Sequence, residues 1–198
     1  MSENAVIETL LTARLVLRSL RREDASVFRD YELRNRERFA PHGPLRTDED
    51  FLPAAFDARV ETMLRDVDSG ASCRWVMRLR DEPQAVIGHV VISAIQRGVR
   101  HAGFLGYGLD AAHEGQGLMS EALVAALAHA FDVLNLHRVE ATHRPENMAS
   151  ARVLAKQGFV REGLARDYIC LDGVWQDSVL NGLCNPRWRS SPVVNQEK

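Results

Sequence analysis

Three segments rich in β-branched and aromatic residues dominate the middle of the chain, at residues 73–79, 85–94 and 101–109. Short turn segments separate them, DEP at 81–83 and QRG at 96–98. Strand-like runs with turns of this kind between them are typical of an antiparallel meander. We therefore expect a sheet that is antiparallel at its centre, which disfavours a doubly wound parallel architecture.

The segments before the meander predict one strand and two helices. Residues 14–20 alternate apolar and charged side chains, as a half-buried strand does. Residues 23–38 are charged and helix-favouring, and residues 51–67 repeat apolar side chains at the spacing of an amphipathic helix. A loop containing prolines and a glycine, at residues 41–44, separates these two helices.

The segments after the meander predict two helices and three strands. Residues 118–134 keep one apolar face through about four helical turns. Residues 139–142 predict a short strand, and residues 147–157 predict a helix that Gly158 ends. The segments 159–171 and 174–183 flank Asp172 and Gly173, the strongest short hairpin signal in the chain.

This order of elements predicts an α+β fold in which a twisted, mostly antiparallel sheet of about seven strands is flanked by about four helices. With 198 residues, the chain has the length of one domain. We expect residues 1–11 to form a flexible lead, residues 12–185 the folded domain, and residues 186–198 a polar C-terminal tail that frays.

Composition excludes several classes of protein. A net charge of −2 argues against a protein whose main partner is a nucleic-acid backbone. No apolar run reaches the ~18 residues of a membrane helix, and the N-terminus lacks the order of a signal peptide. The three cysteines form no CxxC pair and favour reduced thiols, and the seven histidines have no metal-ligand spacing. We therefore expect a soluble cytoplasmic protein without a metal.

Two glycines, Gly115 and Gly117, lie between the meander and the long helix. The first-turn N–H groups of a helix have no intrahelical partners and carry the positive end of the dipole, so an anion docks there when glycines allow a close approach. The alternative is that the glycines only make a tight turn. The spacing GxGxxG of dinucleotide-binding folds and the GxxxxGK[ST] loop of nucleotide hydrolases are both absent.

The order of elements and motifs resembles the GCN5-related N-acetyltransferase (GNAT) family. Within it, the motifs look most like the RimJ/RimL branch, which acetylates the N-terminal amine of ribosomal proteins, and most of all its alanine-specific members. The motifs are TARLVLR (12–18), NR (35–36) with Phe39 and Pro41, LGYGL (105–109), GLM (117–119), EAL (121–123), HR (137–138), PEN (145–147), GF (158–159), EG (162–163), ARDY (165–168) and DGVW (172–175).

The resemblance implies acetyl-CoA as cosubstrate. It assigns the pyrophosphate to the glycine turn and the pantetheine arm to the last meander strand and the helix at 147. The cofactor-binding residues implied are Tyr107, Gly108, Leu109, Gly115, Gln116, Gly117, Leu118, Met119, Ser120 and Asn147. Glu114 and Met119 stand where the family has Gln or Arg and Gly or Ala, and an acid beside a pyrophosphate is unfavourable unless its side chain turns away.

The resemblance also implies catalytic and acceptor-binding residues. The family's usual thiolate-protonating tyrosine has Leu154 in its place, and Ser150 takes that role in the ribosomal-protein branch. For the base, Asp167, Tyr168 and an ordered water remain alternatives. The substrate-binding residues implied are Asn35, Arg36, Tyr168 and Trp175, the last two with packing of the sheet as the alternative role.

The choice of amine follows from its pKa. An α-amino group has a reference pKa of ~7.7–8.0 and a lysine ~10.4, so a lysine needs a much stronger base. No carboxylate lies on residues 101–109, which favours an N-terminal amine. Together with this preference, the resemblance predicts an N-acetyltransferase, monomer or dimer, that transfers acetyl directly to the N-terminal alanine of a ribosomal protein. The alternatives are a small-molecule amine or aminoacyl antibiotic as acceptor, and a non-catalytic ribosome-binding or acyl-CoA-sensing protein.

Overall fold

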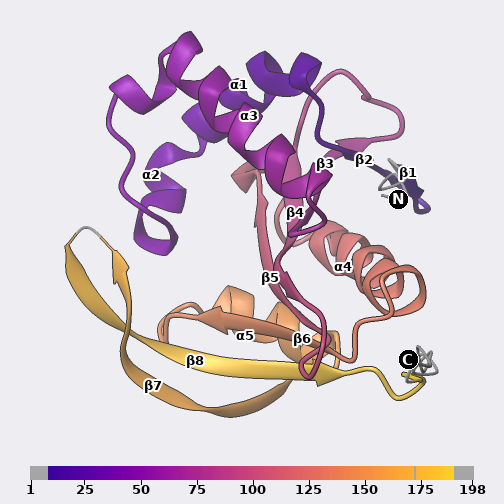
Figure 1. Cartoon of the computed structure of the whole chain (residues 1–198). Helices are drawn as coiled ribbons and strands as arrows, with labels where there is room; N and C mark the ends of the chain where they lie inside the picture. The colour runs from indigo at the N-terminus through magenta and orange to yellow at the C-terminus, as the bar shows by residue number, and fades with distance from the viewer. Residues whose placement is uncertain (1–8, 172, 190–198) are drawn as a thin grey trace, which may run out of the picture.

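The computed structural model describes residues 9–171 and 173–189, and these form one twisted sheet covered by helices on both faces (Figure 1). The strands follow the order β1-β2-β3-β4-β5-β6-β8-β7, and every neighbouring pair is antiparallel except β5 and β6. Their bounds are β1 Thr9–Leu11, β2 Leu15–Ser19, β3 Cys73–Leu79, β4 Gly88–Gln96, β5 Ala102–Leu109, β6 Arg138–His143, β7 Val160–Leu171 and β8 Val174–Cys184. The expected antiparallel meander is therefore confirmed.

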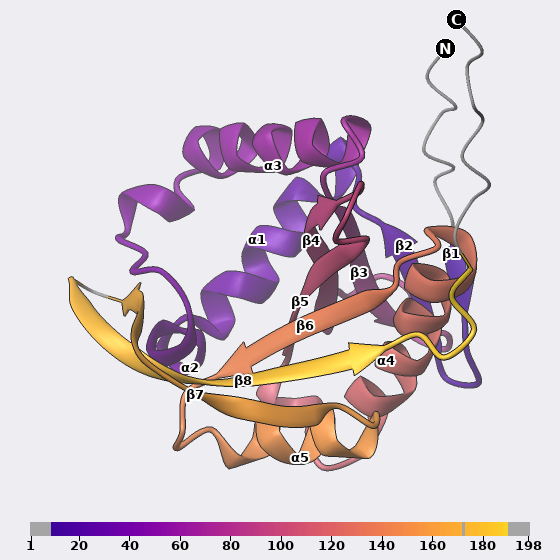
Figure 2. The same ribbon diagram turned by 60° about the horizontal axis from the view of Figure 1, so that its bottom comes forward.

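Five α-helices flank the sheet in the described residues: α1 Ala25–Arg34, α2 Arg36–Phe39, α3 Pro53–Asp68, α4 Leu118–Ala128 and α5 Met148–Lys156. Helices α1 and α3 lie on one face, and α4 and α5 lie on the other (Figures 1 and 2). A π-helical turn, His129–Val133, continues α4. No helix in the described chain is long and apolar enough to cross a membrane.

Two hydrophobic clusters hold the helices to the sheet. Because successive side chains of a strand point to opposite faces, Val76 packs with α1 and α3 while Trp75 and Met77 pack with α4. The cluster on the α1–α3 face centres on buried aromatic rings, among them Phe28 and Phe56. This alternation fixes the register of the central strands, since a shift by one residue would move each of these side chains to the opposite face, into the wrong cluster.

The parallel pair β5 and β6 separates after a short contact. Their register runs only from Ala102 opposite Arg138 to Phe104 opposite Glu140. Beyond Phe104, β5 continues to Leu109 along β4, whereas the rest of β6 pairs with β8. The sheet is therefore open between the second half of β5 and the end of β6.

The structure corrects several expectations at the ends of elements. Residues Thr9–Leu11 of the expected lead form β1, which pairs with β2 and packs Leu10 against the core. The start of the expected tail is packed, since Trp188 contacts the rings of His101 and His137 and donates to the Asn135 carbonyl. The single helix expected at 23–38 is divided at Asn35. Asp172 and residues 190–198 lie outside the described residues.

Candidate active site

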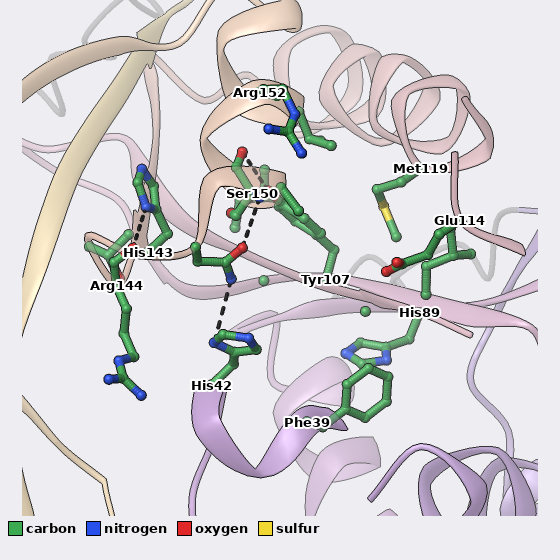
Figure 3. Close-up of a pocket in the computed structure, with 18 of the residues that line it drawn as sticks. Phe39, His42, His89, Tyr107, Glu114, Met119, His143, Arg144, Ser150 and Arg152 are labelled. Carbon is green, nitrogen blue, oxygen red and sulfur yellow. Dashed lines mark hydrogen bonds between the residues drawn. The ribbon is translucent and has the colours of Figure 1, made fainter. Parts of the chain in front are cut away.

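A cavity of about 700 Å³ fills the opening between β5 and β6 (Figure 3). It is bounded by the second half of β5, the glycine loop before α4, the first turns of α5, and the segment that follows α2. The residues expected from sequence that line it are Tyr107, Gly108, Leu109, Gly115, Gly117, Leu118, Met119, Ser120, Asn147 and Ser150. Gln116 does not line it, because its side chain bonds the Ala112 carbonyl.

The glycine loop has a shape that suits an anion. Gly115 and Gly117 adopt left-handed φ values of 72° and 77°, which glycine tolerates and other residues rarely adopt. The first intrahelical bond of α4 runs from the Glu121 N–H to the Gly117 carbonyl, and no side chain caps the helix at Gly117. A Cβ built at Gly115 meets no atom within 4 Å. The loop therefore fits a phosphate group held by the first-turn amides.

The loop is anchored to the N-terminal strands by one carboxylate. Glu121 accepts hydrogen bonds from the Thr12 hydroxyl, at 2.5 Å, and from the Arg14 backbone and guanidinium. The same guanidinium donates to the Gln116 carbonyl at 3.0 Å. The N-terminal strands thus brace the glycine loop from outside the cavity.

Tyr107 and Ser150 meet across the opening of the sheet. Their oxygens, Tyr107 Oη and Ser150 Oγ, lie 2.8 Å apart, a hydrogen bond that joins β5 to α5. Burial raises the pKa of Tyr107 to about 12, so its phenol stays protonated at physiological pH. Asn147 caps α5, because its Oδ1 accepts the Ser150 N–H at 3.0 Å.

Three histidines that sequence motifs did not indicate also line the cavity: His42, His89 and His143. His42, after α2, has its Nδ1 3.5 Å from Asn147 Nδ2. Since Asn147 Oδ1 is already bonded to Ser150, its amide NH₂ faces His42, and the neutral imidazole carries its proton on Nε2. Burial and the Arg144 and Arg38 guanidinium groups lower the pKa of His42 below its usual value, so the ring is neutral at pH 7.

His89 lies on β4 beneath Gly108, against Tyr31 and Phe39. A Cβ on Gly108 would come within 2.7 Å of the His89 ring, so the glycine makes room for the imidazole. Burial lowers the pKa of His89 to about 3, which makes it a neutral polar group rather than a base. Only tertiary packing reveals His42 and His89, because neither belongs to a motif.

The charged side chains around the cavity are mostly basic. Arg152 and Lys156 project from α5, and neither has an ion-pair partner in the described chain. Arg144 donates to the Pro41 carbonyl at 3.2 Å and thereby holds the segment after α2. Glu114 is the sole acidic side chain among the described residues that line the cavity, and it pairs with Arg38.

Asn35 and Arg36 do not line the cavity. The buried Asn35 amide donates to the Tyr31 carbonyl at 2.9 Å and accepts the Ala111 N–H at 3.2 Å. Arg36 pairs with Asp48, and its guanidinium lies over the Phe51 ring. Both residues therefore hold the α1–α2 junction and the following loop, and in this structure neither is placed to contact a ligand in the cavity.

The residues expected on the β7–β8 hairpin also lie outside the cavity lining. Three residues of β7, 166–168, stand opposite one residue of β8, and Asp167 adopts a φ of 46° while its N–H donates to the Asp177 carboxylate. Tyr168 and Trp175 are exposed. The residues of this hairpin that line the cavity are Ile169, Leu171 and Ser178. Because side chains alternate along a strand, Tyr168 lies on the opposite side from Ile169, and Trp175 lies opposite Cys170 on that same outer side.

The antiparallel sheet opens at its one parallel pair beside a glycine loop and a capped helix, which suits a protein that binds a ligand carrying phosphate groups in this opening. The model of the acetyltransferase (GNAT) domain matches residues 14–160, and the chain belongs to this family of acetyltransferases. It is 35% identical to the [ribosomal protein uS5]-alanine N-acetyltransferase of Escherichia coli. The match extends over 179 residues, which are 90% of this chain and 92% of that protein.

Solved structures agree with this assignment. The ribosomal-protein-S5-alanine acetyltransferase of Vibrio fischeri superimposes with a TM-score of 0.86 and 32% identity, covering 92% of this chain and 100% of that one. Mycobacterium smegmatis RimJ, in complex with CoA-disulfide, gives a TM-score of 0.85 and 27% identity, covering 92% of this chain and 90% of that one. The expected GNAT fold is confirmed, with eight strands rather than about seven.

Proposed function

We propose that this acetyltransferase transfers the acetyl group of acetyl-CoA directly to the N-terminal α-amine of a ribosomal protein, with alanine as the first residue. The observation that carries the chemistry is the hydrogen-bonded pair of Tyr107 and Ser150 at the opening between β5 and β6. The acceptor is supported by the 35% identity, over 90% of the chain, to the uS5-alanine enzyme of Escherichia coli.

Acetyl-CoA supplies an activated thioester, and the transfer leaves a thiolate that needs a proton. Ser150 is the proton donor in this proposal, since its hydroxyl lines the cavity at the first turn of α5. Tyr107, with its pKa raised to about 12, stays protonated and lies 2.8 Å from Ser150 Oγ, and in this proposal its phenol is the donor to that oxygen. The pair therefore forms a short relay: Ser150 gives its proton to the thiolate, Tyr107 gives one to Ser150, and the proton that the amine nitrogen loses on forming the amide passes through solvent to restore the phenol.

The amine requires little help from a base. At pH 7 roughly a tenth of an α-amine is neutral, and its deprotonation costs about 1 kcal/mol, against about 4.6 kcal/mol for a lysine. Glu114, the one acid among the described lining residues, is already paired with Arg38. A cavity with this charge favours an α-amine over a lysine, and its basic lining disfavours a polycationic small molecule such as an aminoglycoside.

A peptide panel tests the acceptor. The purified protein is given acetyl-CoA and a peptide that begins with Ala, the same peptide beginning with Ser, an N-blocked peptide with an internal Lys, and an aminoglycoside. Thiol release and the mass gain of one acetyl group are followed. We expect the largest kcat/KM with the Ala peptide. Binding of CoA without turnover of any acceptor would contradict the proposal.

We also propose that the protein acts in the cytoplasm. Its three cysteines, Cys73, Cys170 and Cys184, are all free thiols, which suits a reducing compartment. Ribosomal proteins are acceptors that this compartment supplies. A fusion to a fluorescent protein, followed by fractionation, would test the location, and recovery in the membrane or secreted fraction would contradict it.

A further inference from the structure

An ion pair spans the cavity between its two walls. Glu114 belongs to the glycine loop, Arg38 to α2, and the two are 76 positions apart in sequence. Both side chains line the cavity and both are about four-tenths exposed. Figure 3 shows the Glu114 carboxylate directed into the cavity rather than away from it. The pair is therefore open to whatever occupies the loop.

The carboxylate stands where the loop otherwise favours an anion. The unpaired amides of the first α4 turn and the positive end of its dipole attract negative charge, and Glu114 repels it. A phosphate entering the loop meets both the Glu114 carboxylate and the guanidinium bound to it. Because a guanidinium binds phosphate as readily as carboxylate, the two anions compete for Arg38.

We propose that the Arg38–Glu114 pair gates the pyrophosphate of acetyl-CoA: the pair is closed in the free enzyme, and the pyrophosphate displaces the Glu114 carboxylate and takes Arg38 as a ligand. This inference rests on the proposed function, in which acetyl-CoA is the donor. Arg38 thereby becomes a phosphate ligand contributed by the wall opposite α5, in addition to the glycine loop.

The exchange also links the two substrates. Arg38 is followed in sequence by Phe39 and His42, which both line the cavity, and His42 lies next to Asn147. When Arg38 changes partner, the segment after α2 is no longer tied to the glycine loop through Glu114. Donor binding therefore acts on the wall that faces the acceptor, and the acceptor is expected to bind better after the donor.

Isothermal titration with CoA, and separately with S-acetyl-pantetheine, which lacks the pyrophosphate, tests the gate without turnover. Glu114→Gln removes the competing charge, and we expect it to tighten CoA about threefold, the scale of an anion's interaction with a helix N-terminus. Arg38→Met is expected to weaken CoA roughly tenfold, as loss of a charged hydrogen bond does. Neither change should alter the affinity for S-acetyl-pantetheine.

Glu61→Gln is the matched control, since Glu61 lies on α3 and its carboxylate pairs with Arg22 away from the cavity. This change removes an equal charge and should leave CoA affinity unchanged. High salt should reduce the effect of Glu114→Gln, because exposed charges are screened. Unchanged or weaker CoA binding by Glu114→Gln, or an equal change for S-acetyl-pantetheine, overturns the gate. Failure of the wild-type protein to bind CoA at all would instead overturn the proposed function.

Discussion

Ser150 is held through two of its atoms, which makes its role separable from the stability of α5. Its N–H bonds Asn147 and its Oγ bonds Tyr107. Ser150→Ala keeps the backbone bond and removes the hydroxyl, so we expect kcat to fall about a hundredfold or more while Kd for CoA changes little. Steady-state kinetics and titration measure the two quantities. An undiminished kcat would remove Ser150 from the mechanism.

Tyr107→Phe is the companion change. It removes the donor to Ser150 Oγ but leaves the serine in place, so we expect a smaller loss of kcat, about tenfold, the scale of one neutral hydrogen bond. In the Ser150→Ala background the same change should have little further effect, since the two groups act together. Independent, additive losses would show that the two residues do not form a relay.

Asn147 combines a structural and an electrostatic role that two substitutions separate. Asn147→Ala removes the cap of α5 and should lower the free energy of unfolding by about 1 kcal/mol, measured in urea. Asn147→Asp keeps the cap but places a carboxylate beside His42. The pKa of His42, now lowered by burial and by arginines, should rise, because a nearby negative charge favours the imidazolium. Histidine NMR titration measures it, and an unchanged or lower pKa would contradict the contact.

Local sequence predicted the positions of some site residues and not those of others. Asn147, Ser150 and the loop glycines sit in motifs with fixed spacing along one helix or turn, so local sequence is sufficient to place them. Asn35 was expected to bind the substrate because of the family resemblance of its motif. In the structure it is buried, and its amide bonds the backbone of Tyr31 and Ala111. His42 carried no signal, since its proximity to Asn147 joins residues 105 positions apart.

At the scale of an element, the glycine loop is tested through its backbone. Gly117 and Gly158 both have left-handed φ values, 77° and 85°, so Ala at either position should cost about 1–2 kcal/mol of stability. Only Gly117 lines the cavity. We expect Gly117→Ala to weaken CoA binding at least tenfold, because a Cβ intrudes where the phosphate approaches. Gly158→Ala should destabilise similarly and leave CoA affinity intact.

Chemical unfolding and CoA titration on both variants separate strain from recognition. The Cβ of Ala at 117 would meet the Arg14 guanidinium only at 3.8 Å, an ordinary contact, so the stability loss reports backbone strain rather than a clash. Equal CoA affinity in the two variants would mean that the loop does not cradle the ligand.

The periodicity of apolar residues predicted which segments are strands or helices, but it did not predict how neighbouring strands pair. Apolar spacing indicates strand or helix within about ten residues, which is why the meander, α3, α4 and the hairpin strands were predicted. The opening between β5 and β6 depends on which residue of Arg138–His143 meets Ala102, a long-range register that no local pattern encodes. The irregularity of β7 is similar: no local pattern indicates that its residues 166–168 stand opposite a single residue of β8.

For the molecule as a whole, the net charge does not indicate the charge of the cavity lining. The chain carries −2, yet Arg38, Arg144, Arg152 and Lys156 line one cavity together with a single paired acid among the described residues. Composition argues against a nucleic-acid backbone as the main partner, but it gives no indication of this basic lining. Such a field attracts a polyanionic donor and leaves the weakly charged end of a peptide as a compatible acceptor.

The pH dependence of the whole reaction follows from the protonation of the acceptor amine, His42 and Tyr107. The acceptor's α-amine, near ~7.7–8.0, must be neutral, so kcat/KM for an alanyl peptide should rise about tenfold per pH unit below that value and level off above it. His42 has its pKa lowered and is already neutral in this range, so it adds no second rise. Tyr107, at about 12, keeps its proton, so no alkaline fall should appear by pH 10.

The group responsible for each part of the pH profile of kcat/KM can be checked by changing that group. A peptide that offers only a lysine amine should move the rise toward ~10.4, since the limb belongs to the substrate. Tyr107→Phe should lower the plateau and leave the midpoint of the rise in place, since that midpoint is set by the amine. A fall in rate between about pH 8.5 and 10 in the wild-type enzyme would mean that an acid of lower pKa than Tyr107 supplies the proton, and the Tyr107–Ser150 relay would have to be abandoned.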